Sequence, residues 1–207
     1  TVTVKRDTAL VREDMLFLTQ EHPMVTAAMD LVLSSETGNA AVSAVTNSQL
    51  PEGQFMLELL FIIECSAPCH LQISRFLPHT PVRILIDQTM RDLTTTVPHS
   101  SLISTGDSFE GHQVSAFLNS QRAQITKMLD IARQKAKLEM EKITTSANKA
   151  MLDVLGAEIK RLARLKKVNS NIKDDEIEQL KDVIRLSYSH IQDAQIRLDS
   201  VRFIVTS

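Results

Sequence analysis

The residues best suited to bind a metal ion lie in one short stretch of the chain. Cys65 and Cys69 are separated by three residues, His70 follows directly, and His79 lies nearby. Thiolate and imidazole groups are zinc ligands, but a structural zinc site needs four of them to converge. Cys65 falls on the apolar face of a predicted strand, and the chain has no second cysteine pair. We therefore expect no metal ligand and no bound cofactor in this chain.

Two carboxylates, Glu58 and Glu64, share one face of the same predicted strand. Six residues of strand place them about 20 Å apart, whereas paired acid/base carboxylates lie about 5–10 Å apart. Their position instead predicts ion pairs across the sheet with Arg75 or Arg83.

The chain lacks the motifs of the common catalytic and nucleotide-binding sites. It has only five glycines, and neither a phosphate-binding loop nor a dinucleotide-binding glycine pattern occurs. A serine nucleophile elbow is also absent from the sequence. The sequence therefore predicts no catalytic residue and no cofactor-binding residue.

Charge is distributed unevenly along the chain, whose net charge is −2. Residues 1–110 carry 6 basic and 13 acidic side chains, and residues 111–207 carry 17 and 12. A basic cluster of this kind suits an acidic protein surface or nucleic acid, although it is also typical of a solvated helix end. With one tyrosine and no tryptophan, bases would find no stacking platform, so nucleic acid would be held through its phosphates. The basic excess is greatest beside a predicted helical turn, at Lys160, Arg161, Arg164, Lys166 and Lys167.

These basic residues would be positioned by a long helical hairpin. A helical pattern runs from about Gly111 to Val168, the chain turns at 169–171, and a second helix starts at Asp175, with Glu178 completing a capping box. The first helix would be about 80 Å long, roughly twice its partner, so its N-terminal half must pack across a sheet or break. An alternating three-and-four spacing predicts a seam between the two helices, formed by Ile177, Leu180, Ile184, Ser187, Ile191, Ala194, Leu198 and Val201.

The middle of the chain reads as an antiparallel sheet. Strands are predicted at 55–65, 71–76 and 82–87, joined by short connections, and 201–205 reads as a strand that returns to the sheet. Alternation places one wholly apolar face toward the core, and this face consists of Phe55, Leu57, Leu59, Phe61 and Ile63.

The N-terminal residues give weaker signals. Val2 and Val4 indicate a short strand that leads into a loop at Arg6-Asp7, and 12–18 reads as a helical turn. Residues 24–33 have helical spacing, with Pro23 in the first turn and Gly38 as a stop signal. A loop is predicted at 98–111.

Together these elements predict an α+β fold, with an antiparallel or mixed sheet, a long antiparallel helical hairpin and a C-terminal strand that returns to the sheet. We expect a sheet-containing part at 1–110, the hairpin at 111–200 and the return strand at 201–207. The longest apolar run has five residues, whereas a membrane-spanning helix needs about 20, and two cysteines indicate a reducing cytoplasm.

Three stretches, taken together, resemble the C-terminal region of the RapA family of bacterial RNA polymerase recycling factors, which are SWI/SNF-type ATPases. The resemblance runs in order through essentially the whole chain. The stretches are 6–25, 75–83, and 169–176 with the terminal 197–205.

The resemblance implies that this chain is a non-catalytic accessory region of a larger protein. The larger protein would bind core RNA polymerase, hydrolyse ATP with Mg²⁺ in helicase-like lobes upstream, contact DNA, and promote polymerase recycling in transcription. Its location would be the bacterial cytoplasm, at the nucleoid through polymerase. This region would contact polymerase or neighbouring domains, with the basic hairpin tip as the expected contact.

Two other functions remain open from the sequence. The hairpin is alternatively a structural brace without an external partner. A third reading places an enzyme site in the loop at 98–111.

Overall fold

The computed structural model describes residues 2–12, 14–19, 21–33, 39–45, 50–102, 111–169 and 173–206. The chain divides into two compact units, Thr1–Asn39 and Ala40–Ser207. The sheet and the helical hairpin both lie in the second unit.

The first unit contains the short strands β1 (Val2–Thr3) and β2 (Leu16–Phe17), which pair in parallel, and the helices α1 (Arg6–Val11) and α2 (Pro23–Leu33). The predicted helix at 24–33 is confirmed. The loop at Arg6-Asp7 and the helical turn at 12–18 are wrong, because α1 begins at Arg6 and β2 occupies part of the second stretch. Arg12 ends α1 in an extended conformation. The predicted stop at Gly38 lies outside the described residues.

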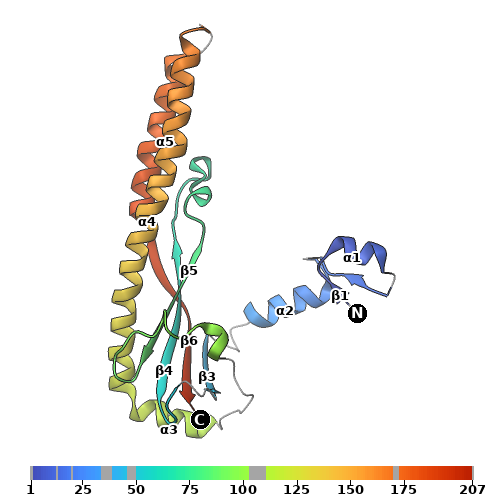
Figure 1. Ribbon diagram of the computed structural model, residues 1–207, viewed down its shortest axis with the longest axis vertical. Coiled ribbons are helices and arrows are strands. Elements are labelled where there is room, and N and C mark those ends of the chain that lie inside the picture. The colour runs from blue at the N-terminus through green and yellow to red at the C-terminus, as the bar shows by residue number, and fades with distance from the viewer. Residues whose placement is uncertain are drawn as a thin grey trace. The chain divides into compact units, whose positions relative to one another are not determined.

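The second unit is built on a four-stranded mixed sheet in the order β3-β6-β4-β5 (Figure 1). Its strands are β3 (Ala40–Val45), β4 (Phe55–Glu64), β5 (Thr80–Asp87) and β6 (Gln195–Thr206). Strand β4 pairs antiparallel with both β5 and β6, and β3 pairs parallel with β6. The α+β class, the mixed sheet and the returning C-terminal strand are therefore confirmed.

Two strand predictions need correction. Strand β6 begins at Gln195 and not at 201, so the last part of the predicted helical seam is strand. The strand expected at 71–76 is instead a pair of 3₁₀ turns, Cys69–Leu71 and Ile73–Arg75, separated by Gln72 with a left-handed φ of 48°. Leu71 and Ile73 are both buried around an exposed Gln72, which is the alternation of a strand, so the pattern alone was misleading.

The long helical region consists of two helices, α3 (Gly111–Ser120) and α4 (Arg122–Lys166), which are separated at Gln121. Phe117 of α3 packs edge-on against Phe55 and Phe203 of the sheet. Both alternatives that length alone suggested are therefore realised: the helical region breaks, and the first half of α4 crosses the sheet (Figure 1).

The main core lies between the sheet and α4. Three residues at intervals of four, Met128, Ala132 and Ala136, have no exposed surface and face this core. The two alanines allow the helix backbone to lie close to the sheet. As predicted, the sheet contributes Phe55, Leu57, Leu59, Phe61 and Ile63, all buried.

Helix α5 (Asp174–Gln192) packs antiparallel on the second half of α4. The predicted seam is confirmed as far as Ile191; beyond the helix end, Ala194 lies in the connection and Leu198 and Val201 lie in β6. The helix begins one residue earlier than predicted. Its N-cap is Lys173, whose backbone N–H donates to Glu176, so Glu178 is not the capping residue.

The seam between α4 and α5 contains buried polar groups. Asn148 of α4 is 4% exposed and Ser187 of α5 is 0% exposed. Neither the Asn148 amide nor the Ser187 hydroxyl has a hydrogen-bond partner among the described protein atoms. A buried polar group without a partner costs free energy, and polar seam residues trade stability for a fixed helix register.

On the other face of the sheet, Glu58 of β4 is 7% exposed and binds cations from two neighbouring strands. It accepts a hydrogen bond of 2.5 Å from Arg83 of β5, and Arg202 of β6 lies 3.5 Å away. Thus Glu58 pairs with Arg83 as predicted, but not with Arg75.

The same cluster holds a loop against the sheet. His99, in the 3₁₀ turn His99–Leu102, places Nδ1 2.9 Å from Glu58. Arg83 donates to the Val97 carbonyl and Arg202 donates to the Leu102 carbonyl. A second, smaller core surrounds the cluster, formed by Val45, Met56, Leu85, Leu102 and Ile204.

Burial raises the pKa of Glu58, but hydrogen bonds from His99 and Arg83 outweigh it, so the group titrates below its ordinary value of 4.5. A lowered pKa in the folded state means that the carboxylate stabilises the fold above pH 4.5. This contribution is lost as the pH falls through the lowered value.

We predict that Asn148→Leu raises the free energy of unfolding by about 1–2 kcal/mol, because it replaces a buried amide without a partner by an apolar side chain of similar size. Urea denaturation of the chain measures this change. Gln134→Leu, at an exposed position of α4, is the control and should change stability by less than about 0.5 kcal/mol. A loss of stability in Asn148→Leu would contradict the assignment of the amide as a destabilising group.

We predict that Glu58→Gln lowers the free energy of unfolding at pH 7 by about 3 kcal/mol, because Arg83 and Arg202 are left half-buried without a counter-charge. Below pH 4.5 the difference from the wild-type chain should shrink as Glu58 becomes protonated. Urea denaturation at a series of pH values tests both statements. The control is Glu64→Gln, because Glu64 is more exposed and its 3.5 Å pair with Arg197 should contribute less than about 1 kcal/mol. A constant difference from pH 7 to pH 3 would contradict the linkage to Glu58.

Candidate interaction surface at the hairpin tip

The hairpin tip is formed by the last two turns of α4 and the start of α5. Within the second unit, the paired helices continue beyond the end of the sheet (Figure 1). The residues of the tip therefore do not contribute to the sheet core. Residue 169 of the predicted turn is described, and residues 170–172 lie outside the described part of the chain.

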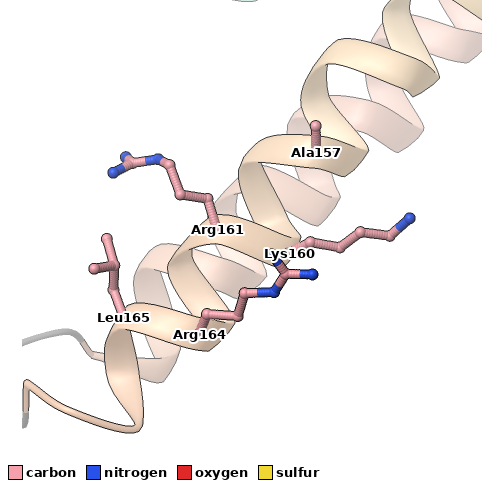
Figure 2. A pocket seen from close by; sticks show the side chains of 5 residues that line it. All are labelled: Ala157, Lys160, Arg161, Arg164 and Leu165. Carbon is pink, nitrogen blue, oxygen red and sulfur yellow. The ribbon is translucent and has the colours of Figure 1, made fainter.

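All five basic residues that the sequence singled out lie on the last two turns of α4 or directly after them. Lys160, Arg161, Arg164 and Lys167 are exposed, and Lys166 is half-buried. Figure 2 shows the first three projecting from the helix, with Ala157 and Leu165 beside them. The five residues labelled in Figure 2 line a shallow hollow on the surface, and all of them belong to α4. The structure thus brings the predicted residues together on an open helix surface, not around an enclosed cavity.

Two of the five cations have acidic partners. The Arg161 guanidinium donates two hydrogen bonds to Glu158, of 2.8 and 2.6 Å. These bonds lower the pKa of Glu158 and raise that of Arg161. Lys166 forms an ion pair with Asp174, the first residue of α5. Lys166 therefore ties the two helices together at the tip.

The other three cations, Lys160, Arg164 and Lys167, form no ion pair with any residue that the structure describes. Next to them, Val168 is 85% exposed and Leu165 is 37% exposed. Charge with adjacent apolar surface is typical of protein contact sites, whose centre is apolar and whose rim is polar. These two apolar residues and the Asp174 partner were not among the predicted contact residues.

The cysteine and carboxylate groups that we considered for chemistry lie elsewhere in the second unit. The Cys65 thiol donates a 3.0 Å hydrogen bond to the carbonyl of His190, and Cys69 is exposed. Burial and the nearby Asp193 carboxylate raise the pKa of the Cys65 thiol, which disfavours the thiolate form that metal ions bind. Within the described residues, no three His, Cys, Asp or Glu side chains are arranged to hold a metal ion.

The loop considered as an enzyme site is only partly described. Residues 99–102 form the 3₁₀ turn that packs over Glu58, and residues 103–110 lie outside the described residues. Among the helices in the described part of the chain, none has the length and apolar character to span a bilayer.

Residues 1–206 match the family described as the RNA polymerase recycling family C-terminal region. Among similar proteins is the RNA polymerase-associated protein RapA of Vibrio atlanticus (strain LGP32), which is 38% identical. The proteins of the same name from Yersinia pestis (strain Pestoides F) and Yersinia pseudotuberculosis (serotype O:1b, strain IP 31758) are 37% identical. Each similarity covers all 207 residues of this chain but only 21% of the relative, so the chain spans about a fifth of these proteins' length.

The match through residue 206 and the identity to several relatives over the whole chain lead to one assignment: the chain belongs to the RNA polymerase recycling family and corresponds to its C-terminal region.

Proposed function

We propose that this chain is a non-catalytic accessory region of an ATP-driven RNA polymerase recycling factor, and that its hairpin tip contacts core RNA polymerase. The observation that carries the proposal is the position of Lys160, Arg164 and Lys167. They are exposed cations without an acidic partner among the described residues, on a helical hairpin that continues beyond the sheet.

The three cations are held in a defined arrangement. The Lys166–Asp174 pair joins the helix ends, and buried Met151 and Ile191 close the seam farther down the hairpin. A contact surface on a rigid element loses less conformational entropy on binding than a flexible segment does. Positive charge also speeds the encounter with an acidic surface and makes the association dependent on salt.

ATP hydrolysis belongs, in this proposal, to a different part of the protein. The relatives named RNA polymerase-associated protein are about five times as long as this chain. ATP and Mg²⁺ would bind to lobes upstream, where DNA contacts also belong. The protein would act in the cytoplasm and reach the nucleoid through polymerase.

We predict that the triple change Lys160→Glu, Arg164→Glu and Lys167→Glu in the complete protein weakens binding to core RNA polymerase by about tenfold at low salt, because attraction becomes repulsion at the interface. The effect should shrink as salt is raised. Equilibrium binding of the complete protein to core polymerase at two salt concentrations measures both.

The matched control reverses three other exposed lysines of α4, with Lys127→Glu, Lys137→Glu and Lys149→Glu. It changes the net charge by the same amount but leaves the tip intact, so binding should stay within about twofold of the wild-type protein. Equal losses in the two variants would mean that only overall charge matters, and no loss in either would remove the tip from the interface.

A structural brace is the second candidate function. The two ion pairs of Arg161 and Lys166 favour it, because they neutralise part of the tip within the chain. Cross-linking of the complete protein to core polymerase distinguishes the two functions. Contact by the tip predicts links from residues 155–175 to polymerase, and a brace predicts none.

A further inference from the structure

Helix α2 is apolar over most of its circumference and has one narrow polar face. Eight of its eleven residues are Met, Val, Ala or Leu, and the others are Pro23, Thr26 and Asp30. Pro23, Thr26 and Asp30 lie at i, i+3 and i+7 and so share that face, and the apolar remainder is much wider than the roughly 100° apolar stripe of a typical surface helix. The pattern of α2 therefore predicts that other protein covers its wide apolar side.

Within the first unit, no other described element covers α2. Met24 is 59% exposed and Met29 is 53% exposed. Among the described elements of the first unit, α2 has no extended packing partner. Met24 and Met29 thus lack the cover that the pattern predicts.

The rest of the first unit is equally open. Of the described side chains in residues 2–30, none is buried. Leu10 and Val11 of α1 are 74% and 84% exposed, and Leu16 of β2 is 54% exposed. Chains below about 40 residues rarely bury enough surface to fold without support, and this unit has 39 residues, of whose described side chains none is buried. It therefore needs an outside surface to complete it.

We propose that α2 is a docking helix for the part of the complete protein that precedes this chain, and that the first unit folds against that upstream part. The relatives supply the length, since the matched region is C-terminal in its family and covers 21% of them. Their remaining sequence is ample to provide the covering surface.

The chemistry of the helix distinguishes this occupant from polymerase. Permanent interfaces are more apolar than transient ones, and Asp30 is the single charged residue of α2. A partner that binds and leaves would expose apolar side chains such as Met24 and Met29 in each free period, which promotes aggregation. An upstream part of the same polypeptide is always present. This inference depends on family membership and not on the proposed role of the hairpin tip.

Site-specific photo-cross-linking tests the docking of α2. The complete protein, free of polymerase, carries benzoylphenylalanine in place of Met29, and the cross-linked peptides are identified by mass spectrometry. We expect links within one molecule, from α2 to residues upstream of this chain. The same group in place of Lys137, an exposed residue of α4, gives the background of non-specific links.

Every other pattern overturns the proposal. Links from α2 to residues 40–206 would show that the second unit covers it, and links between two molecules would show self-association. Links that form only after core polymerase is added would make polymerase the occupant. Absence of links above the Lys137 background would leave α2 uncovered.

Hydrogen exchange tests the docking of α2 in the complete protein without any change to its sequence. We expect the amides of residues 24–33 in the complete protein to be equally protected with and without core polymerase. Protection that appears only with polymerase, or none in either state, overturns the proposal. The cross-linking and the hydrogen exchange of α2 do not depend on the hairpin tip. Their outcomes are therefore independent of whether the triple charge reversal at the tip weakens binding to polymerase.

Discussion

The second unit depends on the burial of one apolar sheet face beneath the first half of α4. Met128, Ala132 and Ala136 lie on the wholly apolar face of β4, and Phe117 of α3 closes one end of this core. Burial of this size is the dominant favourable term in folding. Because α4 is a single helix of 45 residues, anchoring its first half also fixes the direction of its second half. The hairpin is therefore held by apolar contacts at its base, and its tip is free to carry charge.

The two faces of the sheet contribute to the fold through different interactions. At the centre of the face under α4, all the buried side chains are hydrophobic. The opposite face buries Glu58 between Arg83 and Arg202. A buried ion cluster contributes little net stability compared with apolar packing, but its directed hydrogen bonds fix which strands and loops meet. The arginines also bond the Val97 and Leu102 carbonyls, so the cluster positions the segment that leads toward α3. Apolar burial thus supplies stability, and the ion cluster specifies the connection.

Much of the fold followed from local patterns in the sequence. The alternation of apolar residues predicted β4, and the three-and-four spacing predicted the helix seam as far as Ile191. The basic residues were correctly placed at the end of a long helix. The errors arose where distant contacts decide the structure. Strand β3 has the sequence AAVSAV, which lacks a clear alternation, and it is a strand because it pairs with β6. Leu198 and Val201 continue the helical spacing but are drawn into the sheet by antiparallel pairing with β4. The break at Gln121 likewise left no glycine or proline signal.

The central claim is that a sheet-anchored helix presents a contact surface at the far end of the hairpin. Its most direct test replaces residues 156–182 of the complete protein by a short glycine-containing turn, which removes the basic tip and keeps every residue that packs on the sheet. Hydrogen exchange in β4 and β6 confirms that the sheet is intact, and binding to core RNA polymerase is then measured. The account predicts an intact sheet with clearly weakened binding. Undiminished binding by the shortened protein would contradict it.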